Sequence, residues 1–203
     1  MTAPGLQTPG LQTPSWPELA TAISSCTRCP ELVATRQRVV VGQLRQQSRL
    51  LLVGEAPGAQ EDEVGEPFVG RGGQLLDELL EGAGLHRSQV SVANVLKCRP
   101  PANRTPKPAE VANCRSWLTQ QLALADPAVV VALGATATGW FFGRGSRLTE
   151  LRGRPHDVDG RVLVATYHPS AALRFGPKGE PRRLLQADLE LAAALLAQGR
   201  ADA

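Results

Sequence analysis

The chain has 203 residues, of which 42% are hydrophobic and 20% charged, and its formal net charge is +3. This length suits one domain with a sizeable core, and the composition is typical of a soluble globular protein. No apolar run approaches eighteen residues, and the N-terminus lacks the basic-then-apolar layout of a secretory signal. We therefore predict a cytoplasmic protein without a membrane span. The small positive charge permits an acidic partner such as nucleic acid but does not require one.

The first segment, residues 1–15, contains GLQTP twice and is predicted to be a disordered, Pro-rich leader. A short helix is expected over Trp16–Ser25, because Ser15 can cap it and Pro17 suits its first turn. The run RVVVG from Arg38 then indicates a short extended segment.

The middle of the chain alternates between strand and helix patterns. Apolar runs bounded by turn residues predict four buried strands at Leu50–Val53, Val90–Leu96, Ala128–Leu133 and Arg161–Tyr167. Helices are predicted at Gly73–Gly84, Pro108–Leu124, Gly134–Phe142 and Pro181–Gln198. The polar segment Arg147–Pro155 is expected to be an extended arm. This alternation predicts a three-layer α/β/α sandwich over a mostly parallel four-stranded sheet. The single domain spans residues 16–198, and residues 199–203 form a flexible tail.

The stretch that joins the first strand to the next helix is the leading candidate for a site. Between Gly54 and Leu80 it contains two glycine-bearing turns, and the carboxylates of Glu55 and Glu61 stand beside a lone aromatic residue, Phe68. A crevice at the carboxyl end of a strand is where open α/β sheets bind ligands. A passive acidic surface loop is the alternative, and the density of glycines argues against it.

Two further polar residues are predicted at strand ends. Asn94 closes the second strand, where its amide offers an acceptor beside a donor. His168 follows the fourth strand, and Pro169 restricts its backbone to extended geometry. Taken singly, Asn94 also fits a turn cap, and His168 also fits a core histidine.

Four cysteines in a chain without an export signal favour metal or redox use over disulfides. Cys26 and Cys29 form a CxxC pair, whereas Cys98 and Cys114 come from separate elements. This set suits either an iron–sulfur cluster or a structural zinc ion. The long spacing of the second pair favours the cluster.

These motifs closely resemble those of the iron–sulfur (family 4) uracil-DNA glycosylases. The matching segments are the CxxC pair, GEAPGAQED (Gly54–Asp62), PFVGR (Pro67–Arg71), NVLKCRPPANRTP (Asn94–Pro106), Cys114 and HPSAALR (His168–Arg174). The resemblance implies cleavage of the bond between uracil and deoxyribose in single- or double-stranded DNA. It also implies a structural 4Fe–4S cluster on Cys26, Cys29, Cys98 and Cys114, and we expect a monomer.

The resemblance assigns roles around one pocket. Backbone groups of Glu55, Ala56 and Pro57 would line it, and Phe68 would stack on the flipped uracil. Asn94 would read the edge of the base, whose N3–H and O4 match an amide.

The remaining roles concern catalysis. His168 would donate to uracil O2, and Glu61 would occupy the space that the methyl group of thymine needs. The best-known uracil glycosylases carry an aspartate that orients the water, and Ala56 stands there in this chain. The water-positioning group is therefore open between Glu55 and Glu61.

Contacts with DNA are predicted for the segment after the histidine, which resembles a loop that presses into the minor groove. The residues expected to contribute are Pro169, Ser170, Leu173 and Arg174. Basic residues near strand ends are expected to face phosphates; they are Arg99, Arg104, Lys107, Arg147, Arg152, Arg154, Arg174, Lys178, Arg182 and Arg183.

Three other functions compete with this prediction. Related proteins become trapped covalently on uracil-DNA through a histidine in an inserted basic loop, but Arg99–Pro106 contains neither a histidine nor an insertion. A nucleic-acid-binding module with a sensing cluster would bind DNA without releasing a base. A zinc-stabilised binding domain would be colourless.

Overall fold

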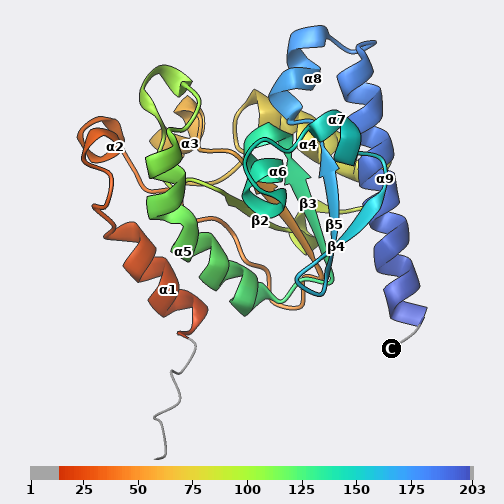
Figure 1. Cartoon of the computed structure of the whole chain (residues 1–203), viewed down its shortest axis with the longest axis horizontal. Coiled ribbons are helices and arrows are strands. Elements are labelled where there is room, and N and C mark those ends of the chain that lie inside the picture. The colour runs from red at the N-terminus through yellow and green to blue at the C-terminus, as the bar shows by residue number, and fades with distance from the viewer. Residues whose placement is uncertain (1–13, 202–203) are drawn as a thin grey trace, which may run out of the picture.

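The structure is a computed structural model that describes residues 14–201. Residues 1–13 of the predicted leader and residues 202–203 of the predicted tail lie outside this range. One mixed sheet forms the centre (Figure 1), with the strand order β2-β1-β3-β5-β4. Strands β2, β1, β3 and β5 are parallel, and β4 is antiparallel to β5. The carboxyl ends of four strands therefore meet along one edge.

The strands are β1 (Leu50–Gly54), β2 (Ser91–Asn94), β3 (Val129–Leu133), β4 (Pro155–Val158) and β5 (Arg161–Thr166). The longer helices are α1 (Trp16–Ser24), α4 (Arg71–Gly82), α5 (Pro108–Ala125), α6 (Gly134–Phe142) and α9 (Glu180–Ala201). The shorter helices are α2 (Pro30–Thr35), α3 (Ala59–Val64), α7 (Leu148–Leu151) and α8 (Pro169–Phe175), with 3-10 turns at Arg87–Gln89 and Pro101–Asn103.

Helices cover both faces of the sheet because the strand side chains alternate between two cores. On one face, Leu50 and Leu52 of β1 pack in the same cluster as apolar residues of α4 and α9. On the other face, Leu51 and Val53 pack in the same cluster as residues of α5 and α6. Continuous burial of β1 on both faces explains why its sequence is an unbroken apolar run.

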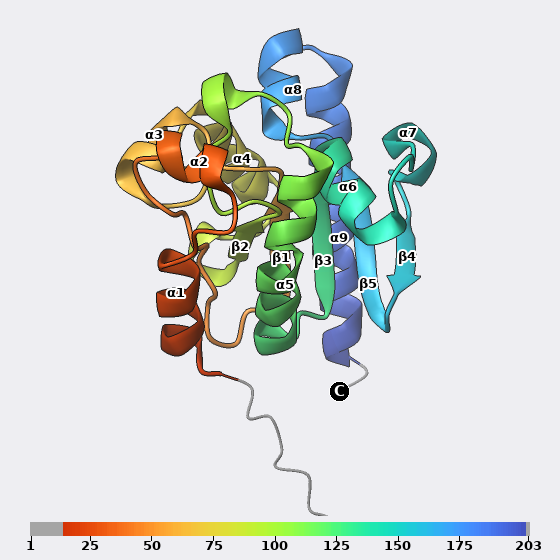
Figure 2. The same ribbon diagram turned by 60° about the vertical axis from the view of Figure 1, so that its left-hand side comes forward.

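A third cluster lies outside the two sheet cores. Helix α1 runs beside α5 (Figure 2), and Leu19 and Ile23 of α1 pack with Trp117 of α5. All four cysteines belong to this cluster or pack against it. The N-terminal part of the described chain, the segment that follows β2 and the middle of α5 therefore form a lobe, here called the cysteine lobe.

The predicted sandwich is confirmed, with corrections at its margins. The sheet has five strands instead of four, because the chain after Arg147 continues into β4, an edge strand. The segment predicted as an extended arm instead contains helix α7. The side chains of β4 alternate between exposed and partly buried positions, so they give no apolar run. Helix α9 continues to Ala201, past the predicted helix end at Gln198. Over residues 14–201, no helix is both long and apolar enough to span a bilayer.

Candidate active site

A cavity of about 350 Å³ opens at the carboxyl ends of β1 and β2, where the first turns of α3, α4 and α8 converge. The residues predicted from the sequence to form the pocket all line it, namely Glu55, Ala56, Pro57, Glu61, Phe68, Asn94 and His168. Topology explains this convergence, because parallel neighbouring strands deliver the residues that follow them to the same edge of the sheet.

Gly54 allows two pocket side chains to approach each other. It is the last residue of β1 and pairs with Asn94 in the register of β2. A Cβ atom at Gly54 would lie 2.4 Å from Asn94 Oδ1 and 2.6 Å from Phe68 Cζ. The amide and the ring therefore meet directly above the glycine. Asn94 is buried, so its orientation is fixed by packing.

Phe68 adopts an unusual backbone conformation, with φ at +57°. Its ring lies 6.2 Å from the imidazole of His168, measured between ring centroids, with 30° between the planes. The guanidinium of Arg87 lies 6.0 Å from the same ring and donates to the carbonyl of Pro67 at 3.0 Å. Arg87 was not predicted from the sequence, because nothing in its local pattern connects it with the pocket.

His168 is held as a neutral hydrogen-bond donor. Burial lowers its pKa from 6.5 to about 4, and the nearby carboxylate of Glu61 opposes this shift only in part. Its Nδ1 accepts the backbone N–H of Ser170 at 3.2 Å, which leaves the proton on Nε2. Gly134 makes room for this arrangement, since a Cβ there would lie 2.9 Å from the Cβ of His168.

The two candidate water-positioning carboxylates differ in their contacts. Both oxygens of Glu61 accept backbone N–H groups, from Gly70 at 2.8 Å and Gly58 at 3.1 Å, so this side chain clamps two glycine turns together. In contrast, Oε2 of Glu55 accepts the hydroxyl of Thr136 on α6. This tether leaves the second oxygen of Glu55 for another partner. Thr136 was missed because it lies eighty-one positions away in the sequence.

The segment predicted to contact DNA is a helix and not a loop. Pro169 is buried in α8, whereas Leu173 packs partly against the core and stays partly exposed. Ser170 and Arg174 are exposed. The helix ends at Phe175, whose side chain is 65% exposed and one of two large apolar side chains exposed in the described part of the chain.

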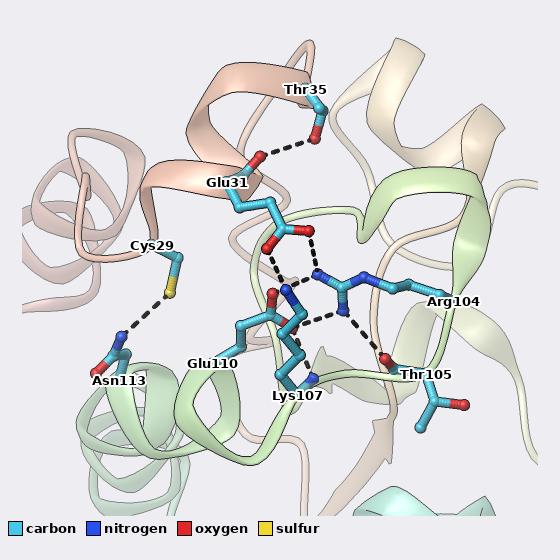
Figure 3. A network of polar contacts seen from close by, with 8 residues as sticks. All are labelled: Cys29, Glu31, Thr35, Arg104, Thr105, Lys107, Glu110 and Asn113. Atoms are coloured by element: carbon cyan, nitrogen blue, oxygen red, sulfur yellow. Dashed lines mark hydrogen bonds and ion pairs between the residues drawn. The ribbon is translucent and has the colours of Figure 1, made fainter.

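Several predicted phosphate-facing residues instead form ion pairs (Figure 3). Arg104 contacts Glu110 at 2.6 Å and Glu31 at 3.1 Å, and Lys107 also pairs with Glu31. These bonds tie α2 to the start of α5. In the same way, Arg152 pairs with a buried aspartate of α9, and Arg182 pairs with a glutamate of α4. Their charges stabilise the fold.

The four cysteines gather at the edge of the cysteine lobe. Cys29 occupies the N-cap position of α2, and Cys114 lies in α5. Their surroundings supply N–H donors to three sulfur atoms: Trp117 Nε1 lies 3.3 Å from Cys26, Asn113 Nδ2 lies 3.6 Å from Cys29 (Figure 3), and Arg36 Nη1 lies 2.9 Å from Cys98. Hydrogen bonds of this kind surround iron–sulfur clusters and set their potentials.

Positive charge also converges on the cysteines. Lys97, next to Cys98, is completely buried, and its ammonium donates to the carbonyl of Asn94 at 2.6 Å and to Gln121 Oε1 at 2.5 Å. Burial raises the pKa of Cys114 to about 11, so a thiolate there needs positive partners. Within residues 14–201, no three side chains of the metal-binding types are arranged to hold a single ion.

The fold and the crevice place the protein among the α/β proteins whose ligand site lies at the carboxyl ends of parallel strands. The chain belongs to the uracil DNA glycosylase superfamily, whose family model matches residues 41–191. A type-4 uracil-DNA glycosylase of Thermotoga maritima is 46% identical over 172 residues, which cover 84% of this chain and 88% of that protein. The type-4 enzyme of Pyrobaculum aerophilum is 42% identical, covering 77% and 84%. The resemblance inferred from the motifs is confirmed.

Proposed function

We propose that the protein is a uracil-DNA glycosylase that hydrolyses the bond between uracil and deoxyribose, releasing free uracil and leaving an abasic site. The observation that carries this proposal is the meeting of Phe68, Asn94 and His168 around one cavity. An aromatic face, an amide and an imidazole N–H are the groups that a planar pyrimidine with two carbonyl oxygens would use. Membership of the superfamily supports the same reaction.

The substrate must leave the base stack before it can react. Extruding a nucleotide costs a few kcal/mol of unstacking and unpairing. Phe68 would recover part of this cost by stacking on the flipped base. The amide of Asn94 would accept from N3–H and donate to O4, whereas cytosine presents the opposite pattern at these two atoms.

His168 would act on the leaving group. As the glycosidic bond breaks, negative charge develops on uracil and positive charge on the sugar. The neutral imidazole donates from Nε2 to uracil O2, where that charge accumulates, and such a contact contributes about 3 kcal/mol or more to the transition state. Water then attacks the sugar. Glu55 is the better candidate to orient it, because the backbone N–H groups of two glycines occupy both oxygens of Glu61.

Helix α8 would meet the DNA next to the opening of the pocket. Ser170 and Arg174 are exposed on it, and the exposed ring of Phe175 stands at its end. Apolar side chains inserted between base steps hold a duplex open. We expect Phe175→Ser to lower excision from duplex DNA about tenfold while sparing single-stranded DNA, since only the duplex closes again behind a flipped base.

We also propose that Cys26, Cys29, Cys98 and Cys114 hold a 4Fe–4S cluster. Four thiolates around such a core carry a net charge of two minus, and the cationic side chains of Arg36 and Lys97 lie beside them. The N–H groups directed at three sulfurs fit the same group. When bound, the cluster supplies four strong bonds that join the N-terminal segment to the segment after β2 and to α5.

The test is incubation with a uracil-containing oligonucleotide, followed by alkali, which breaks the strand at an abasic site. We expect strand breakage with the wild type and losses of about a hundredfold or more with Asn94→Ala and His168→Ala. His86→Ala is the matched control, because this histidine is exposed and lies outside the pocket. Full activity in either pocket variant would remove that residue from the site.

A further inference from the structure

A second concavity lies beside the proposed uracil pocket. It has a volume of about 590 Å³ and runs between the first turns of α5 and the length of α6. We call it the α5–α6 groove. Its wall is mainly apolar, with Val111 and Ala112 on one side and Gly139 and Trp140 on the other. Nothing in the proposed reaction uses this groove.

The groove lies next to the pocket. Thr136 lines the groove, and its hydroxyl donates to Glu55, which lines the pocket. On the other side, Arg104 lines the pocket, and Pro106, two residues further along, lines the groove. The Thr136–Glu55 pair therefore stands between the two cavities, and a ligand that extends from the pocket past this pair would meet the groove.

The chemistry of the groove fits an anionic ligand with an apolar face. Two arginines, Arg115 and Arg144, line it, and its described lining contains no carboxylate. The guanidinium of Arg115 lies over the ring of Trp140, 4.7 Å from its centroid. The indole N–H of Trp140 is buried and has no acceptor within the described protein. The arginines, and not this buried donor, therefore supply the positive charge that an anionic group would meet in the groove.

We propose that the α5–α6 groove binds the nucleotide that flanks the flipped uridine in the same DNA strand. Its base lies against the apolar wall, and its phosphate meets the arginines. This inference rests on the proposed function, because the position of the groove next to the uracil pocket selects a neighbouring nucleotide as the occupant. Bases packed on apolar and aromatic side chains, together with a positive groove, are how proteins hold single-stranded DNA without reading its sequence.

Gly139 offers a way to fill the groove without disturbing the fold. A Cβ added there would meet nothing within 4 Å, and leucine is a better helix former than glycine inside α6. With single-stranded uracil DNA, we expect Gly139→Leu to raise KM on the order of tenfold and to leave kcat unchanged. Ala194→Leu, on the exposed side of α9, is the control.

The substrate provides the second arm of the experiment. A baseless tetrahydrofuran residue replaces the nucleotide on one side of the uracil or on the other. In one of the two positions it is expected to cost the wild type about tenfold in kcat/KM, because no base then fills the groove. Gly139→Leu should show no further loss with that strand, since protein and substrate changes remove the same contact.

Two outcomes would overturn the proposal. If Gly139→Leu matches the wild type on every strand, the groove serves another ligand, such as an acidic peptide. If the loss caused by Gly139→Leu and the loss caused by the baseless residue multiply, the two changes act independently and do not remove the same contact. If the wild type releases no uracil, the proposed function fails. In that case, the affinities of the wild type and of Gly139→Leu for uracil-free strands, with and without the baseless residue, test the groove. Losses of affinity that multiply would again contradict the proposal.

Discussion

The pocket and the cysteine lobe are both assembled from distant segments, but they are held in different ways. Around the pocket, the chain supplies every contact itself: glycines allow close approach, and side chains bond to backbone groups of neighbouring turns. In the cysteine lobe, four thiols converge among N–H donors and buried cations. The protein's own contacts shape the pocket, whereas the lobe gathers the four thiols that we propose hold a cluster.

One side chain connects the two regions. The ammonium of Lys97 donates to the carbonyl of Asn94, while its chain neighbour Cys98 belongs to the cysteine lobe. Gln121 of α5 accepts a second bond from the same ammonium and donates to Val41. The lobe therefore supports the strand end that carries the proposed uracil-reading amide.

The largest effect is expected inside the pocket, from Gly54→Ala. The added methyl group would overlap Asn94 Oδ1 and Phe68 Cζ and force both side chains to move. Because a displacement of about 1 Å costs on the order of a hundredfold in rate, kcat/KM for uracil release should fall by at least that factor. Visible absorbance should be unchanged, and Tm should fall by several degrees, because overpacking a buried site costs about 1–3 kcal/mol. Normal activity would show that the pocket is not preformed.

The next change, Cys114→Ala, lies in the cysteine lobe and acts on the proposed cluster. Losing one ligand should abolish the brown absorbance and lower stability by about 3 kcal/mol or more, a fall in Tm on the order of 10 °C. Thermal melts and iron analysis measure both. Thr119→Ala, exposed on the same helix, is the control. Full iron content or an unchanged Tm in the cysteine variant would contradict the proposed cluster.

The connection between the regions is tested with Lys97→Met. This change leaves the carbonyl of Asn94 and Oε1 of Gln121 buried without their donor, and it should cost about 3 kcal/mol of stability. Adding Gln121→Leu removes the unpaired Oε1 but also the donor to the carbonyl of Val41, so the losses from the two single changes should be less than additive. Denaturant unfolding of the single and double variants gives the coupling. Simple addition of the two losses would show that these groups do not act together.

The smallest effect concerns pH. Because burial lowers the pKa of His168 to about 4, the neutral form persists in the fold far below its ordinary value of 6.5. The histidine should contribute no inflection to the pH profile of kcat between about 5 and 8. Its contribution to stability is complete above pH 6.5 and is lost as the pH falls towards 4. A histidine inflection near 6.5 that disappears in His168→Ala would contradict this.

The sheet was predictable because its parallel strands are buried on both faces and read as unbroken apolar runs. Strand β4 was missed for the complementary reason: it lies at the edge, begins with Pro155 and exposes alternate side chains. Helix α8 was taken as a loop because the family motif describes contacts and not backbone conformation.

The site residues at strand ends were predictable from position and motif, since Asn94 and His168 directly follow apolar runs. The residues that hold these site residues in place were not predictable. Thr136, Arg87 and Lys97 act through contacts that span tens of residues, or through burial that a lone charged residue does not signal. Ion pairs likewise redirected Arg104 from the predicted phosphate contacts.

The most direct test of the central claim is a crystal structure of the protein soaked with free uracil. We predict the ring stacked on Phe68, with O4 and N3 bonded to the amide of Asn94 and O2 within hydrogen-bond distance of His168 Nε2. Uracil bound elsewhere, or bound in this cavity without contact to Asn94 and His168, would contradict the account.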